Sequence, residues 1–565
     1  MARKTGRSSA LAEGFEPKRL IIECAAGAKL AQQGMSLAAD DAPSNLVKAI
    51  KEAGGTIDPE FAPVLIPAVT LQDPMAAGFD NSTRFDVSAE TDACTMILVA
   101  DGDAEVADEL AKHPEVRQVY ADLPIEPCLI CPGSPPLGDF NDVKRLLCTS
   151  RLHGRGMHGN GVLLAIVDTG ISRTHLASKG LTPAMDAARS WVPGPGMTPF
   201  NAPVGHGTMC AYDALLAAPR ATLLDIQLLR STAGGGFSGF LSDAVRAFVH
   251  LRGVMNAPRR PGETRSLVVN NSWGMFHPSW DFPPGDPRNY SDNPNHPFNR
   301  AVAALESAGA DILFAAGNCG SNCPDGRCQG VTTNTIYGAN GHPSVLTVAG
   351  VDTTKQRVGY SSQGPGRLSR NKPDISGYTH FAGSGVYAAD GGTSAACPVV
   401  AGVVAAARTR RPFVPGNPAA SPHAMRDLVR STAQDLGAAG FDFDTGWGVV
   451  NGCAIADRIA PRPVIIDICR RYPWLCYPRP FPLPFSPFPP IPPIPPIPPR
   501  PPFGADAETE PGLDHMAEIE EDDGELTAIL TTAWQRGYEA AMQGGAGHGP
   551  KAPQADKDCG CGCGS

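Results

Sequence analysis

Residues 391–407 read GGTSAACPVVAGVVAAA, a glycine-flanked serine followed by an almost unbroken run of small apolar residues. Such a run predicts an apolar helix, which must be buried. Pro398 is expected in the first turn of this helix, where its missing N–H costs nothing. Ser394 would then lie at the positive end of the helix, close to backbone N–H groups that have no partner within it. The placement suits a nucleophile, and it also suits a buried capping serine.

A carboxylate and a histidine lie in two earlier motifs. Residues 163–170 (LLAIVDTG) are a short apolar run that ends in Asp168 and a turn, as expected for a central parallel strand that delivers a carboxylate to the edge of a sheet. His206 begins a segment of helical length, where the helix dipole favours a neutral imidazole able to act as a base. Alone, Asp168 suits a turn former and His206 a helix cap. With Ser394 they make an acid, a base and a nucleophile in the order Asp, His, Ser.

A possible oxyanion-binding residue follows a third apolar run. Residues 312–318 (ILFAAGN) predict a buried strand that ends at Asn318. The tetrahedral intermediate of acyl transfer needs hydrogen-bond donors aimed at its oxygen, and an Asn side chain with a backbone N–H supplies them. A turn residue after Gly317 is the alternative. The position of Asn318 between the histidine and serine motifs favours the oxyanion role.

Five motifs, in this order, resemble the catalytic domain of the subtilisin-like serine proteases over about residues 160–457. They are AIVDTGI (165–171), GHGT (205–208), NNSWG (270–274), AAGN (315–318) and GGTSAACP (391–398). The resemblance implies a three-layer α/β/α fold with a largely parallel, seven-stranded sheet. It also implies a serine endopeptidase in which Ser394 attacks the peptide carbonyl, His206 takes the proton and Asp168 orients the imidazole.

The resemblance also implies where substrates bind. In that family an extended substrate pairs as an added strand between two edge segments, and its main-chain hydrogen bonds confer broad sequence tolerance. The substrate-binding residues expected here are Gly235, Gly236, Phe237, Ser272, Trp273, Gly274, Ala315, Ala316 and Gly317. The small residues 315–317 favour a medium or large apolar residue before the scissile bond. The aromatic rings of Phe237 and Trp273 either line apolar pockets or belong to the core.

No cofactor is required by this chemistry, and the sequence leaves metal ligands unknown. Calcium is common in the family, but no acidic loop matches a specific site. Cys210 lies one turn beyond His206, where some relatives carry a free thiol, and an inert buried cysteine is expected there. Cys319, Cys323 and Cys328 crowd the loop after Asn318; they predict disulfides in a secreted protein, and free thiols or a metal site in a cytoplasmic one.

Residues 17–125 are predicted to form a ferredoxin-like prodomain. Its expected elements follow the βαββαβ order: strand 19–24, helix 44–53, strands 63–70 and 94–100, helix 104–113 and strand 116–121. Residues 104–122 (AEVADELAKHPEVRQVYAD) resemble subtilase propeptides. The resemblance implies an intramolecular inhibitor whose tail lies in the active-site cleft, with self-cleavage between about Asp122 and Thr149. A permanent module that merely docks is the alternative.

Composition divides the rest of the chain. The expected segments are a disordered N-terminus (1–16), a processing linker (126–158), the catalytic domain (159–460), a proline-rich polyproline II spacer (461–503), an acidic disordered segment (504–524), an amphipathic helix (525–543) and a Gly/Cys tail (544–565). The Cys-Gly repeats of the tail suit a peptide precursor that the protease matures, or a metal- or thiol-binding tail. A non-catalytic binding protein that keeps the fold is a further alternative.

Charge and hydropathy limit the partners. The formal net charge is −10, but ten acidic residues lie between Asp506 and Glu525, so the rest of the chain is close to neutral. Neither nucleic acid nor an anionic membrane is therefore expected as a partner, and peptides or proteins are expected as substrates. No apolar stretch reaches the roughly eighteen residues of a membrane span. Residues 1–20 lack the apolar core of a secretory signal, which predicts a cytoplasmic enzyme or one that leaves by another route.

Overall fold

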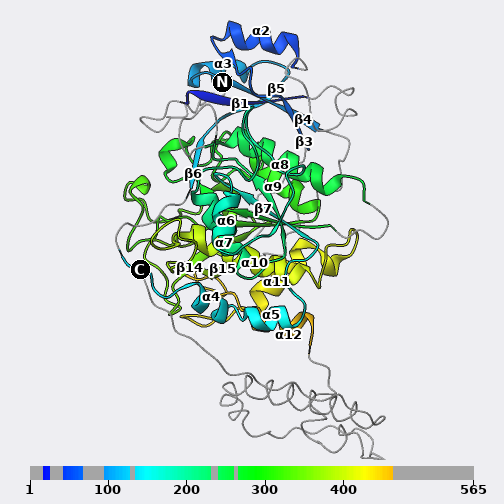
Figure 1. Ribbon diagram of the computed structural model, residues 1–565. Helices are drawn as coiled ribbons and strands as arrows, with labels where there is room; N and C mark the ends of the chain where they lie inside the picture. Colours follow the sequence, from blue (N-terminus) through cyan, green and yellow to red (C-terminus); the bar gives the residue numbers. More distant parts are fainter. Residues whose placement is uncertain are drawn as a thin grey trace, which may run out of the picture. The chain divides into compact units, whose positions relative to one another are not determined.

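The computed structural model describes residues 17–25, 42–67, 94–127, 134–230, 239–259 and 265–461, all within one compact unit, Met1–Tyr477. Predictions for residues 1–16 and for the chain beyond Pro461 lie outside these ranges. In the described ranges, no helix is both long enough and apolar enough to span a membrane. Figure 1 shows the elements in chain order.

A seven-stranded sheet lies at the centre, and every strand pair in it is parallel. Its strand order is β15-β14-β13-β11-β7-β9-β8. The strands are β7 (Val162–Val167), β8 (Ala184–Met185), β9 (Thr222–Ile226), β11 (Ser266–Asn271), β13 (Ala310–Ala315), β14 (Leu346–Val351) and β15 (Ile375–Tyr378). The predicted parallel sheet is thus confirmed. Its central strands are buried on both sides, which explains why they read as continuous apolar runs.

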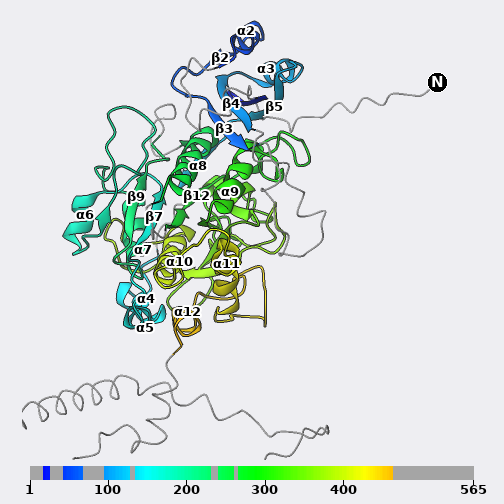
Figure 2. The same ribbon diagram turned by 90° about the vertical axis from the view of Figure 1, so that its right-hand side faces the viewer.

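Helices cover both faces of this sheet. Alternate residues of β7 enter different cores: Leu164 and Ile166 join one hydrophobic cluster, and Leu163 and Ala165 the other. The first cluster contains residues of α7 (His206–Leu215), α10 (Thr393–Arg408) and α11 (Pro422–Ser431), and the second those of α8 (Leu241–Asn256) and α9 (Pro297–Ser307). Figure 2 shows the two groups on opposite sides of the strands. The predicted three-layer α/β/α architecture is confirmed.

Helix α10 is the predicted buried helix, and all its residues are buried. The expectation for Pro398 was wrong in one respect: α10 begins at Thr393, so Pro398 lies beyond the first turn. A proline there cannot donate to the carbonyl four residues earlier, which is that of Ser394. This carbonyl oxygen instead accepts a hydrogen bond from Ser272 Oγ at 3.1 Å. The proline therefore leaves the Ser394 carbonyl available to the neighbouring segment.

The N-terminal module is a five-stranded antiparallel sheet with two helices. Its elements are β1 (Arg19–Ala25), α2 (Ser44–Glu52), β2 (Thr56–Ile57), β3 (Val64–Pro67), β4 (Cys94–Asp101), α3 (Ala104–Leu110) and β5 (Val116–Ala121). The strand order is β5-β1-β4-β2, and β3 also pairs with β4. With β2 and β3 together taken as the second strand, this is the ferredoxin-like arrangement.

The segment 126–158 is not a simple linker, and this expectation needs correction. It begins inside β6 (Pro124–Pro127) and contains α4 (Phe140–Leu146) and α5 (Thr149–Gly154). Val143 and Leu147 are fully buried in the core under α10, and a disulfide joins Cys148 to Cys453 in α12 (Gly452–Ile459). Residues 134–158 therefore belong to the main body of the fold, because their apolar side chains are needed to complete its core.

Short elements complete the structure. They are α6 (Arg173–Ser178), β10 (Gly239–Phe240), β12 (Trp273–Gly274), η3 (Pro278–Trp280), η4 (Gly326–Cys328), η5 (Gly338–Gly341) and η6 (Pro418–Ala420). The cysteines after Asn318 form disulfides rather than a thiol or metal cluster: Cys319 pairs with Cys328, and Cys323 is disulfide-bonded as well.

Candidate active site

Asp168 directly follows β7 at the carboxyl edge of the sheet. Its side chain is fully buried, and one of its carboxylate oxygens, Oδ1, accepts a hydrogen bond from the backbone N–H of Thr169 at 2.7 Å. A buried carboxylate requires such partners, because burial without them would favour the neutral acid. The strand therefore delivers an acid whose position is fixed by the turn that follows.

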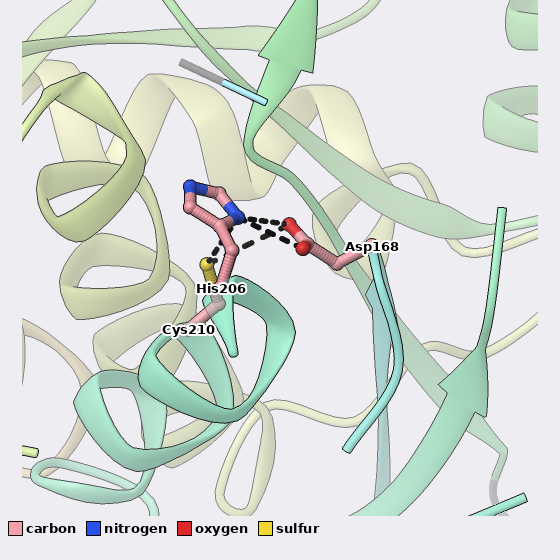
Figure 3. Close-up of side chains that lie close together, drawn as sticks. All are labelled: Asp168, His206 and Cys210. Atoms are coloured by element: carbon pink, nitrogen blue, oxygen red, sulfur yellow. Dashed lines mark hydrogen bonds and ion pairs between the residues drawn. The ribbon is translucent and has the colours of Figure 1, made fainter. Parts of the chain in front are cut away.

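His206 is the first residue of α7, and its imidazole reaches Asp168 (Figure 3). The ring nitrogen Nδ1 lies 2.8 and 3.0 Å from the two carboxylate oxygens. Gly207 permits this approach: a Cβ there would lie 2.6 Å from the carbonyl oxygen of Gly170. The other ring nitrogen, Nε2, is buried and has no hydrogen-bond partner within the described ranges. Asp168 thus fixes the imidazole so that Nε2 is the nitrogen left to accept a proton.

Ser394 is the second residue of α10 and is fully buried. Its hydroxyl donates to the carbonyl oxygen of Ser272 at 3.1 Å, rather than to His206. Cys210 lies between the two groups: its sulfur is 3.5 Å from the Ser394 carbonyl oxygen and 3.8 Å from His206 Nδ1. The three predicted residues therefore come together from β7, α7 and α10, with the serine hydroxyl turned to a neighbouring carbonyl.

The thiol of Cys210 packs against the acid–base pair (Figure 3). Its sulfur lies 3.7 Å from Asp168 Oδ2. Asp168, His206 and Cys210 are close enough to hold a metal ion, but a thiol must lose its proton to become a strong ligand. Burial and the charge of Asp168 raise the pKa of Cys210 well above its usual value. Cys210 is therefore a buried packing group beneath the imidazole, and its inertness stays a prediction.

Asn318 lies next to the serine, and Thr393 orients it. Its fully buried side-chain oxygen accepts hydrogen bonds from the backbone N–H and the hydroxyl of Thr393, at 3.0 and 2.9 Å. These bonds identify the oxygen end of the amide, so the NH2 group is the end directed away from Thr393. The preceding residue, Gly317, has φ +102°, which favours glycine. Asn318 therefore offers a donor beside the start of α10.

The chain's own strand β6 lies between the two predicted edge segments. It pairs antiparallel with β10 on one side and with β12 on the other, where Gly274 lies opposite Glu126 and Trp273 opposite Pro127. Of the expected substrate-binding residues, Gly235, Gly236 and Phe237 lie outside the described ranges. Ser272, Trp273 and Gly274 form the second edge.

Trp273 contributes its backbone to this edge, while its side chain belongs to the core. The ring is fully buried and lies edge-on to Phe314, with 5.1 Å between the ring centroids. The structure therefore places the Trp273 ring in the core and not in the lining of a pocket. Ala315 and Ala316 are buried at the end of β13, and the N–H of Gly317 donates to the Thr393 hydroxyl at 3.1 Å.

Two supporting residues escaped the sequence reasoning. Asn340 donates to the carbonyl oxygens of Trp273 at 2.8 Å and Ala315 at 2.9 Å, and so ties the edge strand to the end of β13. Thr393 orients Asn318, as described. Thr393 adjoins the serine in sequence, so a search of that motif for hydroxyl groups would have found it. Asn340 lies in the short helix η5, whose sequence has no local pattern that points to this contact.

Comparisons with known proteins show the family of this chain. Residues 159–448 match the Peptidase_S8 family, described as the subtilase family. The chain is 28% identical to subtilisin E of Bacillus subtilis (strain 168) over 365 residues, covering 63% of this chain and 79% of that protein. It is 28% identical to subtilisin DY of Bacillus licheniformis over 313 residues, covering 54% and 94%. A solved structure, the S41 psychrophilic protease, aligns at 22% identity with a TM-score of 0.40, covering 52% and 92%.

Proposed function

Because the chain belongs to the subtilase family and is a serine endopeptidase, we propose that Asp168, His206 and Ser394 are its catalytic triad. The observation that supports this most is the buried pair formed by the Asp168 carboxylate and His206 Nδ1 at 2.8 Å, beside the buried Ser394 at the start of α10. The family membership also speaks against a non-catalytic binding protein. A fluorophosphonate probe tests the assignment: labelling at Ser394 that requires His206 supports it, and an unlabelled enzyme contradicts it.

The proposed reaction has two stages. Ser394 Oγ turns from the Ser272 carbonyl, bonds to the peptide carbonyl carbon and gives its proton to His206 Nε2. His206 then protonates the leaving amine as the peptide C–N bond breaks, which leaves an acyl-enzyme. In the second stage His206 takes a proton from water as the water oxygen bonds to the acyl carbon. His206 then returns the proton to Ser394 Oγ as the bond between the acyl carbon and Oγ breaks, which releases the acid and restores Ser394. Asp168 remains ionised and stabilises the imidazolium.

We propose that the Asn318 amide stabilises the oxyanion. Asn318→Ala is expected to lower kcat by about 10²–10³ with little change in KM, the size found for the oxyanion-hole asparagine of subtilisin, because the donor acts mainly on charge that develops in the transition state. Steady-state kinetics on a peptide substrate measure both constants. Thr393→Ser, which retains the hydroxyl that orients Asn318, is the control and should retain most of kcat. An unchanged kcat, or a loss confined to KM, would contradict the role.

The N-terminal module is proposed to be an inhibitory prodomain. Support comes from β6, which fills the place between β10 and β12 that a substrate strand would occupy. A buried ion pair between Glu23 and Arg300 at 2.5 Å, together with an apolar cluster shared with α8 and α9, holds the module on the body. We propose that self-cleavage lies beyond Pro127, where β6 ends, within the predicted range 122–149. N-terminal sequencing of the processed protein tests this, and an N-terminus outside that range contradicts it.

Release of the cleaved module is expected to depend on the ionisation of Asp122. This carboxylate is buried against α8, where it accepts hydrogen bonds from the N–H and hydroxyl of Ser242 at 2.9 and 2.6 Å, and it pairs with Arg19. Burial raises the pKa of Asp122 to about 6, although Arg19 and Ser242 act against the rise. In the released module the pKa should return to about 3.9. Docking is therefore strongest below about pH 4 and weakens as the pH rises through 6.

The corresponding prediction concerns the rate of activation. Release of the cleaved module at pH 7.5 should be up to about tenfold more favourable than at pH 5, which shortens the lag before activity appears. Samples incubated at each pH are assayed at a single pH, so that the pH dependence of peptide hydrolysis itself does not contribute. The Asp122→Asn variant should lose this part of the pH dependence. A lag that changes equally with pH in wild type and Asp122→Asn would show that Asp122 is not responsible.

We further propose that the protein matures in an oxidising compartment. The pairs Cys148–Cys453 and Cys319–Cys328 support this, because structural disulfides are rare in the cytoplasm. Of the two predictions, a cytoplasmic enzyme and an enzyme that leaves the cytoplasm by another route, these disulfides favour the second. No calcium site is assigned, and the role of the Cys-Gly tail stays a prediction from sequence.

A further inference from the structure

The loop that follows Asn318 carries a charged group at the edge of the proposed cleft. A disulfide between Cys319 and Cys328 closes this loop, and both cysteines are buried. The N–H of Asp325 donates to the carbonyl oxygen of Asn318 at 2.8 Å, so the loop returns to the residue where it began. Arg327 lies near the end of the loop, in η4. Its backbone is therefore held in place relative to Asn318.

The guanidinium of Arg327 is oriented by contacts within the main body of the fold as well as by its contact with Glu126. Asp325 accepts hydrogen bonds from Arg327 Nε at 3.0 Å and from Nη2 at 2.8 Å. The guanidinium carbon also lies 3.7 Å from the centroid of the Phe276 ring, a cation–π contact. These contacts restrict the rotation of a side chain that is otherwise flexible. They leave Nη1 as a donor directed at β6.

Nη1 of Arg327 donates to Glu126 Oε2 at 2.8 Å. Glu126 lies opposite Gly274 in the pairing of β6 with β12, and its side chain is 32% exposed, against 23% for Arg327. The ion pair is therefore partly shielded from water. In such an environment charges interact more strongly than at a fully exposed surface. Because Gly274 has no side chain, the opposing residue of the edge strand contributes no selectivity of its own.

The register relates this contact to the proposed scissile bond. Ser394 Oγ donates to the carbonyl oxygen of Ser272, two residues before Gly274. In an antiparallel pair, the residue opposite Gly274 comes two positions earlier in the substrate strand than the residue opposite Ser272. When a substrate peptide binds in the register of β6, its residue opposite Gly274 is therefore the third residue before the cleaved bond. The side chain of this residue lies at Arg327. We call the substrate position opposite Gly274 the Gly274 position.

We propose that Arg327 is a specificity-determining residue that selects an acidic side chain at the Gly274 position of substrates. The inference rests on the proposed triad and on substrates binding in the register of β6. A carboxylate there accepts a hydrogen bond from Arg327 Nη1, as Glu126 does, whereas a lysine brings a like charge to it. Asp325 offsets part of the positive charge, so the selection is a preference rather than an absolute requirement.

The test compares three peptides with the sequence of residues 121–134, in which serine replaces both cysteines and the Gly274 position carries Glu, Gln or Lys. At low ionic strength the processed enzyme should cleave the Glu peptide about fivefold faster than the Gln peptide, and about tenfold or more faster than the Lys peptide, measured as kcat/KM. High salt should reduce these ratios, because it screens the ion pair. Equal values of kcat/KM for the three peptides would overturn the proposal.

Three variants separate Arg327 from other sources of preference. Arg327→Gln should bring the three rates together, and Arg327→Glu should reverse the order of the Glu and Lys peptides. Asp325→Asn keeps a hydrogen-bonding side chain of the same size but removes a negative charge, so it should increase the preference for Glu. A preference for Glu that persists unchanged in both Arg327 variants would overturn the proposal.

Fluorophosphonate labelling distinguishes this failure from failure of the proposed triad. A variant that is labelled at Ser394 and cleaves the Gln peptide is folded and active, so its peptide ratios report on Arg327 alone. Labelled enzyme that treats the three peptides alike overturns the specificity and leaves the triad intact. Absence of both labelling and cleavage in the wild-type processed enzyme would overturn both proposals.

Discussion

The Ser394→Ala variant should remain a full-length chain of 59.1 kDa, with no measurable peptide hydrolysis. The substitution removes the proposed nucleophile and its hydrogen bond to the Ser272 carbonyl, while the other buried side chains of α10 are retained. The expected loss in kcat is about 10⁶, the size found when the serine of subtilisin is replaced. Intact mass and peptide hydrolysis measure the two effects.

Ser272→Ala is the matched control for this prediction. Ser272 Oγ donates to the Ser394 carbonyl, so this variant disturbs the position of the serine without removing the nucleophile. It should retain self-cleavage and fluorophosphonate labelling, at a reduced rate. If Ser394→Ala protein yields the same fragments as wild type, the cleavage comes from another protease and self-processing is wrong.

Asp168→Asn should lower kcat by about 10⁴, the loss measured for the same change in another serine protease triad. The Asp168 carboxylate accepts the proton on His206 Nδ1 across 2.8 Å, which leaves Nε2 unprotonated. An amide can present an NH2 group instead, which favours the tautomer with the proton on Nε2, and this tautomer cannot act as the base. Steady-state kinetics and the rate of fluorophosphonate labelling should fall together.

The control for this substitution is Asp225→Asn on the neighbouring strand β9. Asp225 is a second fully buried carboxylate, but it accepts hydrogen bonds from Phe200 and Gln227 rather than from His206. Its loss should affect the stability of the fold and leave most of kcat. A similar fall in kcat for both variants would indicate that the effect of Asp168 comes from the fold and not from the imidazole.

Local sequence patterns were sufficient for the main elements of the fold. The apolar runs at 163–167 and 312–315 predicted buried strands, and the run at 399–407 predicted a buried helix; all three are found. The reason is that burial on every side requires apolar residues at every position, which a single segment reveals by itself. The position of Pro398 was misjudged because the start of α10 depends on Thr393 and Asn318, which lie in different motifs.

The candidate site was predictable in its members but not in its contacts. The motif order identified Asp168, His206 and Ser394, and the structure brings them together. The order did not reveal that the Ser394 hydroxyl donates to Ser272, or that Asn340 ties β12 to β13. Hydrogen bonds of this kind join segments more than 60 residues apart, and their partners have no common spacing along the chain.

The amino-acid sequence by itself determined the buried elements and the family, and it supplied the residues that we propose as acid, base and nucleophile. Only the tertiary structure decided what lies between β10 and β12, which cysteines pair, and that Arg327 meets Glu126 across 201 residues of sequence. The physical reason is that periodicity and composition report the environment of a residue along its own segment. A contact between distant segments depends on how the strands and loops of the whole chain are placed, so it appears only once the chain has folded.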